Sequence, residues 1–346
     1  MADLRLIARS ALVSFALASL QLPAGAQQPT QKPTWTAPRL PDGHPDFQGD
    51  WTNSSITVLE RANAKLPLVL SPEQVKQLEK QRAAQGAADA APTAPTEGAP
   101  AAGGGVGGYN QFWLDRGAHV GVVKGEPRSS WITDPPSGQI PFSADGKKRI
   151  AAILAKRSEN GPEGMNPADR CLIGSRGSGG PPMLNNMYNN TYQIVQAPGV
   201  VMIDVEMMHD ARIIRMSETT PRPDAVKQWL GDSVGHWEGD TLVVVTSGWM
   251  RLQGDYEPIY LSETATVTER FSRAAKDEIL YQFAIDDPAF YSQIWKGEMT
   301  FSPSNGPVYE YACHEGNYAL PHILAGARVN ERKPGAKPAT GGEAGE

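Results

Sequence analysis

The sequence has no apolar run long enough to cross a membrane, which takes about 20 residues in a helix. The apolar stretch at residues 10–22 is shorter. It follows Arg5 and Arg9 and precedes the small residues at 24–26. This pattern is typical of a secretory signal peptide covering residues 1–26. We therefore expect an exported protein with no membrane insertion.

An excess of positive charge is also missing, because 32 Lys and Arg residues stand against 38 Asp and Glu residues, a formal net charge of −6. Acidic and basic residues are mixed along the chain, as on an ordinary solvated surface. We therefore expect no nucleic acid as a partner. Charge alone does not identify a ligand.

Two familiar catalytic or cofactor motifs are absent. The stretch "GSRGSGGPP" at residues 174–182 lacks the preceding strand and the Gly-Lys-Ser/Thr ending of a phosphate-binding loop. The string "GDSVG" at residues 231–235 runs directly into a predicted strand, whereas the serine elbow of a hydrolase leads into a helix. We expect neither a nucleotide cofactor nor a serine nucleophile.

Cysteine is scarce, with only Cys171 and Cys313. In an oxidising compartment two thiols are more often paired than free, so we predict a disulfide between them. In the chain-entropy model a bridge over so long a loop stabilises the fold by on the order of 4 to 5 kcal/mol. A paired Cys313 could not act as a nucleophile.

The rest of the chain divides by composition. Residues 27–108 form a predicted N-terminal arm, with a capped helix at 70–85 and a Gly/Ala-rich linker at 86–108. Residues 109–330 form a predicted single β-rich domain with one amphipathic helix at 143–161. Residues 331–346 are predicted to be a disordered tail.

Short alternating segments separated by turn residues begin at Thr191. Pro198-Gly199 and Glu238-Gly239-Asp240 mark two of the hairpin turns. The fold class we predict is mainly β, an antiparallel meander that closes into a lipocalin-like barrel or a curved sheet. A barrel of about eight strands can hold one small ligand.

Three histidines lie at predicted strand ends of this sheet. In "VVMIDVEMMH" the period of two places His209 at the end of an inward row. His236 precedes the "WEGDT" turn, and His314 ends "VYEYACHE", which we predict to be a strand. Trp249 and Trp295 stand next to turns, where they could line the barrel mouth.

This set allows three interpretations. A histidine could act as general base, with Asp210 or Glu315 orienting it and Arg212 or Arg270 stabilising an oxyanion. Alternatively, His209, His236 and His314 could bind zinc, although none shows the close spacing of a preformed metal pair. Purely structural roles are the third interpretation.

Several strings resemble a large, mostly uncharacterised family of exported proteins from Gram-negative bacteria. They are "LPDGHPDFQGDW", "MMHDARIIRM", "WLGDSVGHWEGDTLVVVT", "VTERF", "IDDPAFY" and "YEYACHEGNY". The resemblance implies a periplasmic location and extends to a lyase that releases formaldehyde from lignin-derived aromatic dimers. The matching positions carried over as candidate catalytic residues are His209, Asp210, Arg212, His236, His314, Glu315 and Tyr318.

The function that these observations predict is a periplasmic, cofactor-independent lyase that acts on a small aromatic molecule by proton transfer. A histidine would remove the proton, an arginine would stabilise the oxyanion and Tyr318 would donate to the departing oxygen. The alternatives are a non-catalytic carrier of a hydrophobic small molecule and a metal-dependent hydrolase. The sequence does not predict the oligomeric state.

Overall fold

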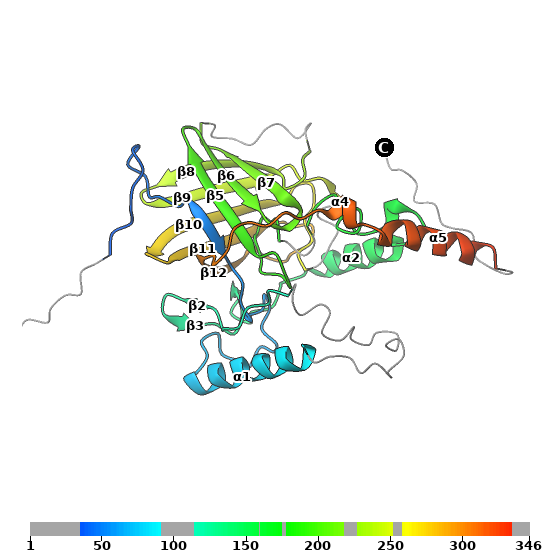
Figure 1. Cartoon of the computed structure of the whole chain (residues 1–346), viewed down its shortest axis with the longest axis horizontal. Coiled ribbons are helices and arrows are strands. Elements are labelled where there is room, and N and C mark those ends of the chain that lie inside the picture. The colour runs from blue at the N-terminus through cyan, green and yellow to red at the C-terminus, as the bar shows by residue number, and fades with distance from the viewer. Residues whose placement is uncertain are drawn as a thin grey trace, which may run out of the picture. The chain divides into compact units, whose positions relative to one another are not determined.

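The computed structural model describes residues 35–90, 114–158, 160–174, 178–217, 227–251 and 258–333 (Figure 1). Three predicted features lie wholly or largely outside these residues: the signal peptide at 1–26, residues 91–108 of the linker and residues 334–346 of the tail. Apart from Trp35, the described residues belong to one compact unit, Thr36–Glu346.

Period-two alternation produces the longest strands. In β10 (Thr266–Ala275) and β11 (Glu278–Asp286) buried and partly exposed residues alternate almost without a break. The two strands pair antiparallel, from Thr266 opposite Asp286 to Ser272 opposite Leu280. One face of this hairpin therefore enters the core and the other stays near solvent.

The main sheet joins β1 to β12 in the order β1-β5-β6-β7-β8-β9-β10-β11-β12, and β1 also pairs with β12, so these nine strands form a closed barrel. β4 (Ile132–Asp134) adds outside β12, and β2 (Val122–Val123) pairs with β3 (Glu126–Pro127). The other strands are β1 (Gly49–Thr52), β5 (Thr191–Ala197), β6 (Val200–Val205), β7 (Asp210–Arg215), β8 (Asp232–Glu238), β9 (Thr241–Ser247) and β12 (Trp295–Pro303). The predicted mainly β barrel is confirmed.

Two details of the barrel differ from the prediction. β7 and β8 run parallel and share only the pairs Ile214–Ser233 and Arg215–Val234, so the sheet is not antiparallel throughout. Strand β1, which lies within the predicted N-terminal arm, closes the barrel by pairing with both β5 and β12. Part of the arm is therefore integral to the barrel.

The helices lie outside the barrel wall (Figure 1). Ser71 caps α1 (Pro72–Asp89) in a reciprocal capping box with Gln74, and Ser143 caps α2 (Ala144–Lys156). Both predicted helices are confirmed, and α1 continues into the first residues of the predicted linker. The remaining short elements are η2 (Pro162–Gly164), η4 (Met207–His209), α4 (Cys313–Gly316) and α5 (Ala319–Glu331).

Aromatic rings fill much of the barrel interior. Phe301 stacks on Tyr192 at 5.3 Å between ring centroids and contacts Tyr281 at 5.2 Å. Trp249 and Trp295 are fully buried, so the prediction that they line an open mouth is wrong. Trp295 is the first residue of β12 and pairs with Ile285, and the buried Trp249 donates from Nε1 to the Ala265 carbonyl at 3.1 Å.

The predicted disulfide is present between Cys171 and Cys313, with a Cα–Cα distance of 5.7 Å. The predicted strand that contained Cys313 is wrong. β12 ends at Pro303, and after an irregular stretch the chain forms α4 and α5. The Tyr309 and Tyr311 alternation suggested a strand, but the bridge ties Cys313 to the loop at residues 165–174, outside the barrel, where no strand offers a ladder of hydrogen bonds.

No helix among the described residues is both long enough and apolar enough to span a membrane.

Candidate functional site

His209 lies in the turn between β6 and β7. The alternation predicted a continued strand, but the chain must reverse between Val205 and Asp210, which pair across the hairpin. It does so through η4, where His209 has a positive φ of 53° and an exposed side chain. The prediction that His209 ends an inward row is therefore wrong, because the turn directs it to solvent.

Asp210 begins β7 and is partly buried. Burial raises the pKa of its carboxyl to about 6; the Gly174 N–H, which donates to Oδ2 at 3.3 Å, acts in the opposite direction, and the nearby Asp204 carboxylate adds to the rise. A carboxyl with this pKa exchanges its proton close to neutral pH. Asp210 is therefore a candidate for proton transfer in this region.

Arg212 points into the barrel and is held there by a carboxylate. Its Nη1 and Nη2 donate to Oε1 and Oε2 of Glu269 at 3.1 Å and 2.5 Å, and the side chains are 1% and 0% exposed. Tyr281 donates to Glu269 Oε1 at 2.7 Å. Burial opposes the positive charge of Arg212, but the charge and hydrogen bonds of Glu269 outweigh it and raise the arginine pKa.

The polar network continues to the segment that covers this end of the barrel. Burial and the Glu269 charge hold the Tyr281 pKa well above its usual value, so the phenol stays protonated. Its oxygen accepts from the Met183 N–H at 2.9 Å. Tyr192 donates to the Ser178 carbonyl at 2.9 Å, so two interior tyrosines fix both ends of the segment Ser178–Met183.

His236 lies at the far end of the barrel. Because β7 and β8 run parallel with Ile214 opposite Ser233, Asp210 and His236 are separated by roughly 20 Å along the strands. The exposed imidazole contacts Glu238 at 3.3 Å, and Glu238 accepts from Arg270 at 2.7 Å. This outer cluster cannot act together with His209 or Asp210.

His314, Glu315 and Tyr318 follow the disulfide on α4 and at the start of α5, and all three are exposed. Tyr318 retains 74% of its accessible surface. The three residues are close in sequence, and none of them lines the barrel cavity described below.

The three histidines proposed as a zinc set are therefore distributed over a turn, a distant strand end and an outer helix. Within the described residues no group of three or more His, Cys, Asp and Glu side chains is close enough to hold a metal ion. A site built from His209, His236 and His314 does not fit this geometry.

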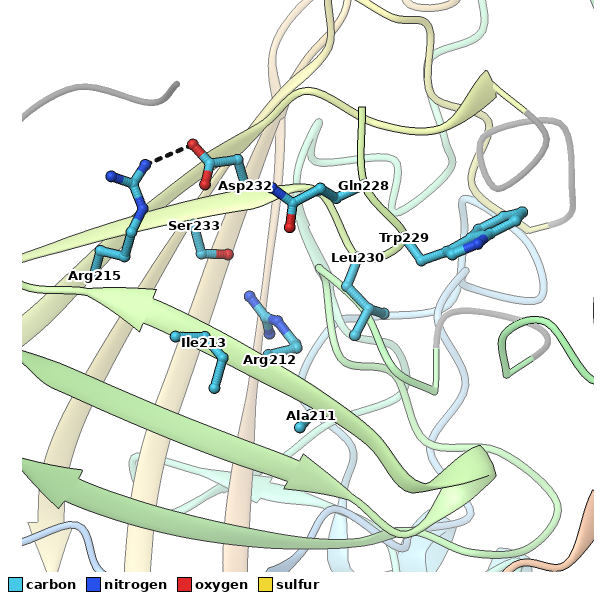
Figure 2. Close-up of a pocket in the computed structure, with 10 residues that line it drawn as sticks. Ala211, Arg212, Ile213, Arg215, Gln228, Trp229, Leu230, Asp232 and Ser233 are labelled. Atoms are coloured by element: carbon cyan, nitrogen blue, oxygen red, sulfur yellow. Dashed lines mark hydrogen bonds and ion pairs between the residues drawn. The ribbon is translucent and has the colours of Figure 1, made fainter. Parts of the chain in front are cut away.

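A cavity of about 240 Å³ opens where β7 and β8 diverge from their short parallel contact (Figure 2). Arg212 from β7 and Ser233 from β8 face the space between the strands, whereas Trp229 points away from it. Arg215 and Asp232 form an ion pair at 2.7 Å beside them. The complete lining is Ala211, Arg212, Ile213, Arg215, Gln228, Trp229, Leu230, Gly231, Asp232 and Ser233.

Asp210 is not one of the lining residues, but its carboxyl lies near Leu230, which is. A Cβ placed on Gly179 would lie 3.0 Å from Leu230 Cδ2 and 3.7 Å from Asp210 Oδ2, so both side chains approach the same glycine. The carboxyl with the raised pKa and the cavity lined by Arg212 therefore belong to one region of the fold. Because Gly179 has no side chain, Leu230 and Asp210 can both lie close to its backbone.

Sequence reasoning missed Glu269. A signal was present, because Glu269 stands between Val267 and Phe271 on the inward face of β10, and all three are buried. A buried carboxylate in an apolar row needs a partner of opposite charge. Arg212 is such a residue, because it lies on the inward face of β7, two residues before the buried Ile214. The pairing of the two could not be derived without the strand order.

No protein-family model matches the chain, no curated protein matches its sequence, and no solved structure matches its fold. The resemblance stated from the sequence strings therefore stays a prediction, and the function has to be argued from the geometry of the site.

Proposed function

We propose that the protein is an exported, periplasmic lyase that cleaves a small aromatic molecule by proton transfer in the cavity between β7 and β8. The reaction is an elimination or a retro-aldol-type cleavage. Either one moves a proton from one atom of the substrate to another as the bond breaks, so neither needs an external oxidant.

The position and pKa of Asp210 carry this proposal. A general acid or base works best when its pKa is close to the operating pH, and burial raises the Asp210 pKa to about 6. At neutral pH the carboxylate accepts a proton from the substrate, and the resulting acid returns it to the departing group. Asp210 takes the role that the sequence assigned to a histidine.

Arg212 supplies the positive group for oxygen charge that develops during the reaction. Both of its terminal nitrogens are committed to Glu269, but Nε has no hydrogen-bond partner among the described residues. A buried donor held in place before the reaction stabilises developing charge without reorganisation. His314 and Tyr318 have no part in this mechanism, because both are exposed on the segment of α4 and the start of α5.

The test compares wild type with Asp210→Asn on a panel of aromatic compounds, including lignin-type dimers because of the sequence resemblance, with products identified by mass. Losing the acid and base should lower turnover by about 10²-fold or more. The matched control is Asp240→Asn, since Asp240 is exposed at the opposite end of the barrel and pairs with Arg39. Equal turnover in wild type and Asp210→Asn would exclude this mechanism.

The second candidate function is a non-catalytic binding protein. It is favoured by the two hydrogen bonds with which Glu269 holds Arg212 in place and balances its charge. A fixed ion pair whose Nε donor is unused can orient a ligand without performing chemistry. Ligand that stays bound through gel filtration, with no product from any member of the panel, would support the carrier. Product that grows linearly over many turnovers would exclude it.

A further inference from the structure

We propose that the cavity between β7 and β8 selects an uncharged, oxygen-bearing aromatic molecule over a carboxylate, through one directed donor, Arg212 Nε. This inference deepens the proposed function, on which the aromatic character of the ligand rests. Its remaining parts come from the charges and hydrogen bonds that surround the cavity.

The ionic groups at the cavity are already balanced. Arg212 is bonded to Glu269 at both terminal nitrogens, and Arg215 is paired with Asp232 at 2.7 Å. Asp210 adds a further carboxyl at the Leu230 end. A ligand carboxylate would therefore enter a site where each arginine has a carboxylate partner and another acidic group stands nearby.

Because these charged groups are largely removed from water, their charge balance decides whether a charged ligand can bind. An anion leaving water needs a compensating positive charge, and without one the desolvation cost is several kcal/mol. A neutral carbonyl, hydroxyl or ether oxygen loses much less hydration and needs only a hydrogen-bond donor. The same lining therefore accepts the neutral oxygen and rejects the charged one.

One buried donor fits this need. Arg212 is 2% exposed, lines the cavity, and has an Nε with no hydrogen-bond partner among the described residues. Glu269 fixes the guanidinium plane from behind, and Tyr281 fixes Glu269 in turn. Leaving a buried N–H unsatisfied is costly, so a ligand oxygen that accepts from Nε is stabilised by the removal of that cost.

The opposite wall adds a second polar contact. Ser233 Oγ and Thr246 Oγ1 lie 2.8 Å apart, and one hydroxyl hydrogen satisfies that bond. When Thr246 donates in this bond, the Ser233 hydroxyl hydrogen is available to an acceptor on the ligand. At about 30 Å³ per water, the cavity of about 240 Å³ has the volume of roughly eight waters, which suits one substituted ring.

The experiment is a calorimetric titration of the mature protein at neutral pH with benzamide and with benzoate, which match in ring and carbonyl group but differ in charge. We expect benzamide to bind at least 10-fold more tightly. Benzoate binding as tightly as benzamide, or no binding of benzamide at millimolar concentration, would overturn the inference. This comparison needs no variant.

Arg212→Lys then tests the donor, because lysine keeps the positive charge beside Glu269 and removes Nε. Benzamide affinity should fall about 10-fold, the value of one buried hydrogen bond of about 1.4 kcal/mol. Arg270→Lys, on the outer face of the barrel, is the matched control and should leave affinity unchanged. Unchanged affinity in a folded Arg212→Lys variant would contradict the assignment of the donor.

The outcomes also separate this inference from the proposed lyase activity. If benzamide binds selectively and its binding depends on Arg212, but no member of the substrate panel gives a product, the proposed ligand class is supported and the lyase activity is excluded. If carboxylate substrates are turned over in preference to their neutral counterparts, the proposed ligand class is wrong and the lyase activity is supported.

Discussion

Glu269 and Arg270 are neighbours on β10, yet they form two ion pairs in opposite environments. Glu269 faces the barrel interior, is fully buried and binds Arg212 at two points. Arg270 faces outward and meets Glu238, with 39% and 50% of their side-chain surfaces exposed. Successive side chains in a strand point to opposite faces, so one residue forms an ion pair inside the barrel and the next forms one at the surface.

This difference in burial predicts that the stability of the fold depends on the interior ion pair and hardly at all on the outer one. Water solvates either member of the outer pair if its partner is lost, so the contact contributes little. The interior pair has no such replacement, and loss of one partner leaves a buried charge uncompensated. The same isolation from water is what makes the remaining Arg212 donor useful to a ligand.

The largest effect is expected from Glu269→Gln. It removes one charge of the interior pair and keeps the side-chain size, so the free energy of unfolding should fall by about 3 to 5 kcal/mol. Urea denaturation followed by far-UV circular dichroism measures the change. A loss below about 1 kcal/mol would mean that Arg212 finds another partner or water inside the barrel.

The next effect is expected from Cys171→Ser combined with Cys313→Ser. The bridge closes a sequence separation of 142 residues outside the barrel wall. Its loss should lower the free energy of unfolding by about 2 to 4 kcal/mol, mainly by freeing the unfolded chain. Denaturation with and without a reductant checks this, and the double variant should no longer respond to the reductant.

Asp210→Asn should change stability in a pH-dependent way. Burial raises the Asp210 pKa in the folded state to about 6 from its ordinary value of 3.8, so the folded state binds this proton more tightly. Stability therefore falls as pH rises through that window, by on the order of 3 kcal/mol in total. The asparagine variant should be more stable than wild type above pH 6 and gain little near pH 4.

Thermal unfolding at several pH values measures this difference. A stability gain that is equal at pH 4 and pH 8 would show that the Asp210 carboxyl does not titrate with a raised pKa. Such a result would also remove the support for Asp210 as the general base of the proposed lyase.

The smallest effect is expected from Arg270→Ala. Its partner Glu238 is half exposed, and hydrogen bonds from Arg270 and His236 lower the Glu238 pKa. The midpoint of thermal unfolding should stay within measurement error of wild type. A clear drop would show that the outer pair carries more of the fold than its exposure indicates.

Local pattern was enough to predict most strands of the second half, the helices at Ser71 and Ser143, and the disulfide, but it wrongly predicted a strand around Cys313. These features depend on residue alternation, capping side chains or thiol chemistry, all of which act over short distances or between only two candidates. The closure by Gly49–Thr52 and the parallel contact of β7 with β8 depend on partners far along the chain. No local signal specifies them.

The candidate site was predicted in part. Asp210 and Arg212 were named from the sequence; Arg212 lines the cavity, and Asp210 lies near the lining residue Leu230. His209 was assigned to the interior because the alternation runs through it, but the turn at η4 ends the strand first. Glu269 was missed because a charged residue in a strand is usually solvated, and only the strand order reveals its partner.

The seam where the barrel closes has a consequence for how the molecule is made. Trp51 pairs with Pro303 and Thr52 with Ser302, so the strand synthesised first waits for the one synthesised last. Pairing between such distant segments is entropically costly and slow to form. A chain cut short before β12 has an unpaired edge on both β1 and β11, and would be exposed to misassembly until the missing strand arrives.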